Sequence, residues 1–374
     1  MRRSKRMRIY PWDINGYVKL SWGGKQKLFR YLISDYKTIK NINNNLGLPN
    51  YWFNNFKRND KVNTKEPKKI VDITNLNLVG DIIQFNDDNG GSSISYLGTF
   101  PIKYDPFWHF LFCLSVGDGH IQKINRKRFT WYQKPEWQEK LIELLKKHNF
   151  NYKSSPKSTK QGIVVPQLIR KIGSFVTGLD SSESIRNNIV EKSRMLGKEF
   201  ELALLFAFLL DEAGMSKSKS NSEITLHQEG NLQLLEKIGR LLDRFNIKWS
   251  RNKKGDKWCI RLNSGGVVQL SKLFISLEKY GITLLHRKDI FYKKVNMAEK
   301  TMYKLPLKQE AISIRKYLLD SYKDRIITTN EIKTYFASKF NVSSRCQKLI
   351  STMKLKKELQ HVSLGKYVIK GEQK

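Results

Sequence analysis

Two segments of the sequence carry the same pattern, an apolar run of helical length that ends in acidic residues. The first run covers residues 110–121 and the second covers residues 204–215. Each run is apolar on every side of a helix, so we expect each helix to be buried against another helix. The helix dipole disfavours a carboxylate at a C-terminal helix end. We therefore expect a cation close to Asp118 and Glu212, the acids that end the two runs.

The similarity between the two segments continues beyond the acidic residues. The first run is followed by a predicted strand, Phe129–Gln133, and by an amphipathic helix over 136–147. The second run is followed by a predicted strand, Glu223–Gln228, and by an amphipathic helix over 232–244. The same order of elements at two places indicates an internal duplication.

The duplication divides the rest of the chain. We predict an α+β protein with five parts: a helical head at 1–60, a small β unit at 61–104, two half-domains at 105–195 and 196–300, and a tail at 301–374.

The repeated motif resembles a known family. Residues 111–119 resemble the LAGLIDADG motif of homing endonucleases, and residues 205–213 resemble a second copy of it. The resemblance covers about 105–300 and implies a duplicated αββαββα core with pseudo-two-fold symmetry. In that family the motif helices form the interface and the sheets lie in the DNA major groove. Val116 replaces the inner acid of the first copy, and Ala213 replaces the glycine after the acid of the second.

The resemblance also implies a set of site residues. The last acid of each motif, Asp118 and Glu212, would bind Mg²⁺, since two close carboxylates repel unless a divalent cation shares them. Gln133 and Gln228 would lie near the catalytic centre, and Lys288 would be its basic residue. Carboxylates, Mg²⁺ and a phosphodiester are the components of metal-assisted hydrolysis. For both glutamines the alternative is an exposed strand residue, and for Lys288 it is a phosphate contact.

The head offers a second type of DNA contact. Helices predicted at 37–46 and 50–58 flank a Gly-Leu-Pro turn, which is typical of a helix-turn-helix. A plain helical hairpin fits the same residues. If the segment is a helix-turn-helix, its last helix carries side chains suited to bases and phosphates: Asn54, Asn55, Lys57 and Arg58.

The β unit and the tail are also predicted from local patterns. Short β-like runs occur at Val71–Ile73, Ile82–Phe85 and Ser93–Tyr96, with a hairpin signal between the last two. The tail has three predicted helices and a hairpin, the winged-helix order; a plain helical tail is the alternative. The remaining candidate DNA contacts are Lys134 in the core and Arg345, Gln347, Lys348 and Lys366 in the tail.

The charge of the chain points to a polyanionic partner. Lys and Arg number 69 against 34 Asp and Glu, a formal net charge of +35. Such a surplus repels itself unless a polyanion such as DNA neutralises it. Three distant cysteines favour neither a zinc site nor a disulfide framework. With no signal peptide or membrane span in the sequence, we expect a monomer on double-stranded DNA, either cytoplasmic and nucleoid-associated or organellar.

Two functions follow as expectations. The first is a site-specific, Mg²⁺-dependent double-strand DNA endonuclease, which the retained acids Asp118 and Glu212 favour. The second is a non-cleaving DNA-binding regulator on the same core, which the two flanking DNA-binding-like segments favour. An RNA-splicing maturase is a third reading. Intein chemistry is not expected, because the chain begins Met1-Arg2 and lacks a terminal His-Asn pair.

Overall fold

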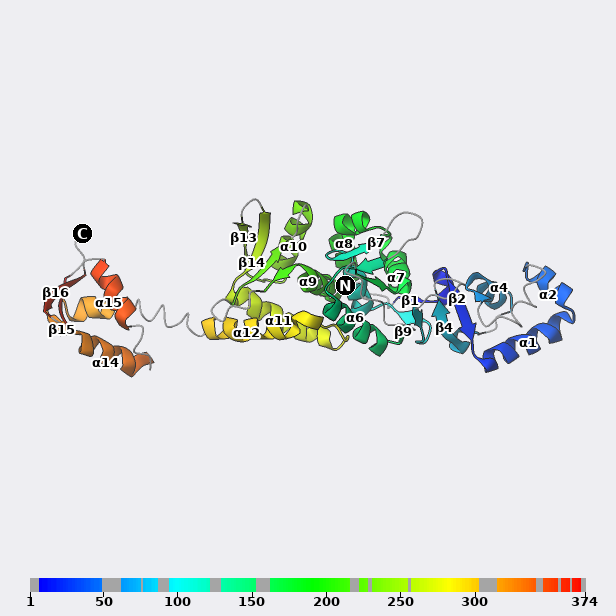
Figure 1. The fold of residues 1–374 in the computed structure, drawn as a ribbon, viewed down its shortest axis with the longest axis horizontal. Helices are drawn as coiled ribbons and strands as arrows, with labels where there is room; N and C mark the ends of the chain where they lie inside the picture. The colour runs from blue at the N-terminus through cyan, green and yellow to red at the C-terminus, as the bar shows by residue number, and fades with distance from the viewer. Residues whose placement is uncertain are drawn as a thin grey trace. The chain divides into compact units, whose positions relative to one another are not determined.

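The computed structural model forms a mixed α+β protein with several small antiparallel sheets (Figure 1). It divides into two compact units, residues 1–295 and 296–374. No helix among the described residues is long and apolar enough to cross a membrane. The structure describes residues 7–48, 62–74, 77–86, 94–121, 129–152, 162–215, 222–227, 231–254, 257–302, 315–340, 346–355, 358–363 and 365–370.

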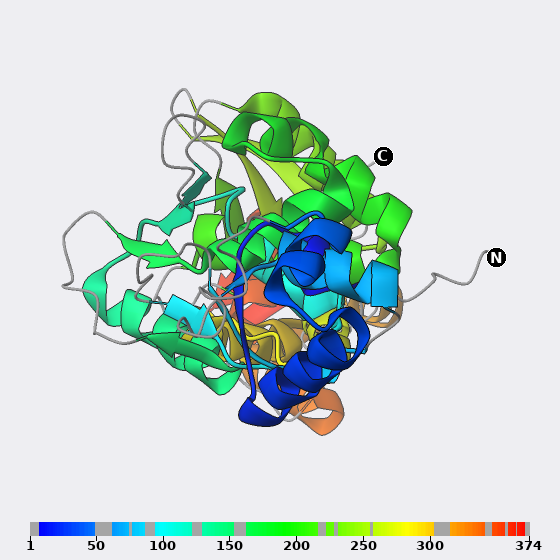
Figure 2. The same ribbon diagram turned by 90° about the vertical axis from the view of Figure 1, so that its right-hand side faces the viewer.

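The first unit begins with an N-terminal segment built on a five-stranded antiparallel sheet of order β3-β2-β4-β5-β9 (Figure 2, blue to cyan). The strands are β2 (Tyr17–Leu20), β3 (Val62–Asn63), β4 (Ile82–Asn86), β5 (Ile94–Tyr96) and β9 (Phe150–Tyr152). The helical elements are η1 (Pro11–Asp13), α1 (Trp22–Tyr36), α2 (Ile39–Asn45), α4 (Lys65–Thr74) and η2 (Val79–Asp81). A separate strand pair joins β1 (Arg8–Ile9) to β6 (Ile102–Lys103).

Two expectations for this segment are wrong. Val71–Ile73, predicted as a strand, lies within α4. That helix begins just after Asn63, whose side chain accepts a hydrogen bond from Lys65 N at 3.0 Å, a typical helix-start contact. The head and the β unit are also not separate, because β2 from the head pairs with β4 and places Val18 opposite Phe85. Local patterns show that a strand exists, but they do not show which distant strand it pairs with.

The centre of the first unit contains the same order of elements twice: helix, two strands, helix, two strands, helix. The first copy contains α5 (Pro106–Cys113), β7 (Gly119–Ile121), β8 (Phe129–Trp131), α6 (Pro135–Lys147), β9, β10 (Ile163–Val165) and α7 (Gln167–Thr177). The second contains α9 (Lys198–Glu212), β11 (Ala213–Gly214), β12 (Ile224–His227), α10 (Leu232–Arg244), β13 (Trp249–Lys254), β14 (Lys257–Leu262) and α11 (Ser264–Glu278). Helix α8 (Ser182–Leu196) joins the copies, and η3 (Leu285–Arg287) and α12 (Lys288–Met302) follow the second.

The two copies pair their strands alike, with one exception. The second copy has the order β11-β12-β14-β13, and the first has β7-β8-β10. The register agrees as well, since Gly119 lies opposite Trp131 and Ala213 lies opposite Leu226. The exception is β9, which takes the place of β13 in the chain order but pairs with β5 of the N-terminal segment.

The two apolar runs lie in neighbouring buried helices. Helices α5 and α9 pack against each other. Every residue of α5 is buried, and α9 is buried from Glu201 to Asp211. Helix α5 begins at Asp105, whose carboxylate accepts hydrogen bonds from Phe107 N at 3.0 Å and Trp108 N at 3.3 Å. This packing sets where the acidic ends of both helices lie.

The second unit has its own small core. Its elements are a helix over 315–321, β15 (Ile326–Thr328), α14 (Thr329–Phe340), α15 (Cys346–Leu355), β16 (Leu359–Ser363) and β17 (Lys366–Ile369), with the sheet order β15-β17-β16. The core contains buried side chains from all of these elements, among them Leu318, Ile327, Ile332, Met353, Leu359 and Ile369. Strand β15 adds a third strand beside the predicted hairpin.

Candidate active site

Asp118, the acid that ends the first apolar run, lies on a turn that has room only for glycine at position 119. Helix α5 ends at Cys113, and Asp118 follows on the turn that leads into β7. A Cβ on Gly119 would lie 2.1 Å from the carbonyl oxygen of Leu114, a backbone atom that has little room to move. Asp118 is half-buried, and the Nε2 amide of Gln133 donates a hydrogen bond to its carboxylate. Two of the predicted site residues are therefore in direct contact.

Glu212, the acid that ends the second apolar run, lies within its helix. Helix α9 continues to Glu212, and Ala213 follows with φ −76° and ψ 122°, an extended backbone that any residue adopts. The glycine that the family motif has at this position is thus not required here. Glu212 itself is half-buried. The substitution by Ala213 leaves the end of the helix intact.

Asp211 is a site residue that the sequence did not single out. It is 5% exposed, and its Oδ1 accepts a hydrogen bond from Trp131 Nε1 at 3.0 Å. A Cβ on Gly117 would lie 2.4 Å from Asp211 Cβ, so the glycine makes room for the acid across the helix ends. Asp211 Oδ2 is buried and has no hydrogen-bond partner among the described residues. The acids of the two copies therefore meet at one place.

Arg287 is a basic residue in contact with this place. The guanidinium of Arg287 donates to Asp211 O at 3.0 Å and to Ala213 O, the open carbonyls at the C-terminal end of α9. A cation there is favoured by the helix dipole. Lys288 is exposed at the start of α12, so its proposed role near the acids stays a prediction.

Burial raises the pKa of two acids at this site, and neighbouring charges shift each pKa in a different direction. Burial raises the pKa of Asp118, against the charge of Arg287 and the hydrogen bond from Gln133, which lower it. Burial raises the pKa of Asp211 well above its usual range, and the charges of Asp118 and Glu212 raise it further. Three carboxyl groups thus share the field of one guanidinium, and the site favours additional positive charge.

The first turn of α6 supports two of these side chains. Gln138 Nε2 donates to Gln133 O at 2.6 Å, which fixes the backbone that carries the Asp118 contact. The ring of Trp137 stacks on the ring of His286, with centroids 3.9 Å apart and an interplanar angle of 6°. His286 immediately precedes Arg287. This turn of the first copy therefore contacts both Gln133 and the η3 segment that carries Arg287.

The other predicted contacts are placed as follows. Lys134 is exposed, with its ammonium 5.0 Å from the centre of the Trp137 ring. Lys366 is exposed in β17, and Gln347 and Lys348 lie in α15. Outside the described residues are Asn54, Asn55, Lys57, Arg58, Gln228 and Arg345. In sequence position, Gln228 corresponds to Gln133. Gln133 comes two residues after Trp131, the strand partner of Gly119, and Gln228 comes two residues after Leu226, the strand partner of Ala213.

Both sheets of the repeat have an open polar face. On β12 and β14 the residues Thr225 and Arg261 alternate with the buried Leu226 and Leu262. The corresponding face of the first copy's sheet carries His120, Thr130 and the apolar Val164. On the face of the second copy, Arg261 forms an ion pair with Glu223, and the hydroxyl of Thr225 donates a hydrogen bond to Gly214 O.

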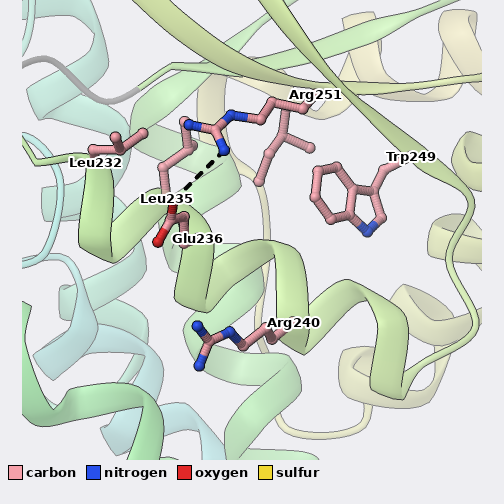
Figure 3. Close-up of a pocket in the computed structure, with 7 residues that line it drawn as sticks. Leu232, Leu235, Glu236, Arg240, Trp249 and Arg251 are labelled. Carbon is pink, nitrogen blue, oxygen red and sulfur yellow. Dashed lines mark ion pairs between the residues drawn. The ribbon is translucent and has the colours of Figure 1, made fainter.

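A pocket of about 320 Å³ lies elsewhere on the second copy, between α10 and the β13–β14 hairpin (Figure 3). Leu235 and Ile260 are buried in its lining, and Arg251 pairs across it with Glu236 at 3.6 Å. Its remaining lining residues are Leu232, Arg240 and Trp249. None of the acids at the helix ends lines it, so it is separate from the candidate site.

Two signals in the sequence pointed to the residues that were missed. The run Leu285-His286-Arg287-Lys288 marks a basic segment but does not say which cation turns inward. Asp211 precedes the motif acid, and its importance depends on Gly117 across the helix pair. Comparison of the chain with protein-family models, with curated proteins and with solved structures finds no match.

Proposed function

We propose that this chain is a site-specific, metal-dependent double-strand DNA endonuclease of the LAGLIDADG homing type. One observation carries the proposal: two segments with the same element order place helices α5 and α9 side by side, with Asp118 on the turn after α5 and Glu212 at the end of α9. The acids then meet in one buried site beside Arg287. Such a site is unfavourable in isolation, and a divalent cation bound to substrate phosphate would relieve it.

The side chains present fit a Mg²⁺ ion. Among the described residues, no group of three or more His, Cys, Asp or Glu side chains forms a metal-binding cluster. Mg²⁺ usually takes only one or two carboxylates, with water and phosphate oxygens as its other ligands. Asp118 and Glu212 would supply those carboxylates, and the unpartnered Oδ2 of Asp211 shows unused acceptor capacity beside them. When bound, the ion would supply an activated water and charge stabilisation at the phosphate.

The remaining residues have roles that follow from their contacts. Gln133 orients the carboxylate of Asp118 through its amide hydrogen bond. Arg287 supplies a fixed positive charge close to the place where phosphate charge would develop. Trp131 holds Asp211 by its indole N–H, so that this acid does not swing towards the phosphate. Each of these residues positions charge and none needs to form a covalent bond.

The surface around the site is suited to duplex DNA. The open sheet faces carry Arg261, Thr225 and His120, side chains that reach bases and phosphates. The net charge of +35 provides the non-specific attraction. The second unit, whose order of helices and strands matches a winged helix, would add contacts through Lys366. These features support DNA rather than a small acidic molecule as the partner.

A non-cleaving DNA-binding regulator on the same core is the second candidate. Arg287 favours it, because its guanidinium already compensates the acids beside which a metal ion would bind. In that case the acids would serve the fold and the sheets would still read DNA.

The test is a plasmid assay. Supercoiled plasmids carrying sequence from the flanks of the encoding gene are incubated with the chain and Mg²⁺, with a chelator as the control. We expect nicked and linear products with Mg²⁺ only, and none from the Asp118→Asn/Glu212→Gln double variant. Tight binding to one sequence without cutting would select the regulator. A wild type that neither cuts nor prefers any duplex would refute both functions, and RNA would be tested next.

A further inference from the structure

The outer strand of the first copy belongs to a different sheet from its counterpart. In the second copy, β13 pairs with β14 from Trp249 to Lys254. In the first copy, β9 pairs with β5 of the N-terminal segment, with Ser95 opposite Asn151. The N-terminal sheet is thus joined to the first copy by backbone hydrogen bonds and has no equivalent on the second copy among the described residues.

Alternation along β9 shows which face of the shared sheet is turned outwards. Phe150 and Tyr152 are buried, and the ring of Phe150 lies 5.8 Å from Trp108 of α5 and 5.3 Å from Tyr96 of β5. This face therefore packs on the first copy. Asn151, between the two aromatic residues, is exposed on the opposite face.

The strand register extends that opposite face across all five strands. Five polar residues form one row from β3 to β9: Asn63, Tyr17, Asn86, Ser95 and Asn151. The next row on the same face pairs Lys19 with Gln84. Asn86 and Ser95 are buried at the centre of the row, and the other five side chains reach solvent. Among the described residues of these strands, this face carries one cation, Lys19, and no acid.

These side chains have the chemistry of a nucleic-acid contact. Asn and Gln amides both donate and accept hydrogen bonds, as the edges of bases do, and Lys and Tyr reach phosphate oxygens. Strands can enter a DNA groove and present alternate side chains to it. Asn86 and Ser95 are buried, so the contacts with DNA would come from the five side chains of this face that reach solvent.

We propose that the polar row of the sheet β3-β2-β4-β5-β9 contacts duplex DNA next to the core site, on the side of the first copy only. The inference rests on the proposed DNA-binding function and adds an asymmetry to it. The bound duplex extends further beyond the first copy than beyond the second. The charge of the whole chain, +35, favours DNA over a second copy of the chain as the occupant of this face.

The test compares two charge-matched double variants of the full chain. Asn63→Asp/Asn151→Asp places a carboxylate at each end of the row, and Asp at position 63 can still accept the hydrogen bond from Lys65 N. The control, Asn187→Asp/Gln233→Glu, adds the same charge at exposed positions of α8 and α10. Affinity is measured for a duplex that covers only the core and for one extended at both ends.

We expect the row variant to bind the extended duplex about tenfold more weakly than the control does, because its carboxylates face phosphate. Both variants should bind the short duplex alike, and a hydroxyl-radical footprint of the wild type should be longer on one side. Equal affinities on the extended duplex would overturn the inference and leave the proposed function standing. A chain that binds no duplex would refute the function itself, and a row variant altered only in self-association would assign the face to a second copy.

Discussion

The ends of α5 and α9 occupy equivalent places in the two copies, yet they hold their acids differently. At the end of α5, Asp118 lies on a turn, half-buried, and accepts a hydrogen bond from Gln133. At the end of α9 the helix continues to Glu212, and Asp211 points into the interior between Gly117 and Trp131. The first end is a loop closed by glycine, and the second is a helix end capped by an arginine.

The difference shows where two segments with the same order of elements stop being alike. Gly117 and Asp211 hold equivalent positions, each directly before the acid of its segment, and they lie against each other. Identical segments would place either two glycines or two acids at this contact. A glycine opposite an acid fills the space, and the buried acid then needs a donor, which is Trp131 from the first copy. The two copies therefore depend on each other at the point where they meet, and substitutions at equivalent positions should have unequal effects.

The largest expected effect is on strand cleavage. Asp118→Asn and Glu212→Gln should each lower the rate of double-strand cutting about a thousandfold, or about 4 kcal/mol, through loss of a metal ligand. DNA affinity should hold or rise, because a carboxylate facing phosphate is removed. Time courses of supercoiled, nicked and linear plasmid measure both variants. If each acid serves one strand, single variants accumulate nicked circles; unchanged linearisation by either variant would contradict its role.

The next effect separates the two turns by stability. Gly119→Ala should lower the free energy of unfolding by about 3 kcal/mol, because its Cβ would overlap the carbonyl oxygen of Leu114. The matched change at the other end, Ala213→Gly, should cost only about 0.5–1 kcal/mol from backbone entropy. Urea denaturation compares them. Equal losses would show that the two ends are closed in the same way.

A smaller effect concerns the support of Arg287. Trp137→Ala removes the ring on which His286 stacks, so it should lower the cleavage rate about tenfold, or about 1.4 kcal/mol, by loosening Arg287. Trp137→Phe keeps an aromatic surface and should recover most of the rate. Single-turnover cleavage and DNA affinity are measured together. A loss of affinity alone, with the rate unchanged, would place Trp137 in DNA binding instead.

The smallest effect is a change in pH dependence. Burial raises the pKa of Asp211 in the folded chain above its value in the unfolded chain. The wild type therefore loses stability as pH rises from about 4, the usual Asp pKa, towards the folded pKa. Asp211→Asn does not titrate and can still accept from Trp131, so its stability relative to the wild type should grow over that interval. Parallel stability curves from acid to neutral pH would contradict the burial of a titrating acid there.

The sequence predicted what local patterns can determine. The two apolar runs, their acidic ends and the strand and helix after each follow from periodicity along a single stretch, and the elements occur there. The family resemblance implied that Asp118 binds the metal ion and that Gln133 lies near the catalytic centre, and the two side chains are in contact. Asp211 was missed because its environment is made by Gly117 and Trp131, which are distant in the chain.

Two further differences have the same origin. Arg287 was passed over for its neighbour Lys288, because the choice between adjacent cations depends on which way the η3 turn faces. The strand predicted at Val71–Ile73 is helical, since three residues are too few to distinguish alternation from one side of a helix. Which strands pair, which way a side chain points and how deeply it is buried depend on contacts in the folded chain. The periodicity of a short stretch of sequence does not determine them.

The pairing of β9 with β5 has a consequence for synthesis on the ribosome. The N-terminal sheet cannot be completed when its own residues emerge, because its edge strand ends at Tyr152, after α5 and α6. Until then β5 presents an open edge, the kind of surface on which nascent chains aggregate. Loop closure over this span also slows the step. The N-terminal segment should therefore acquire protease resistance together with the first copy during translation, and not before it.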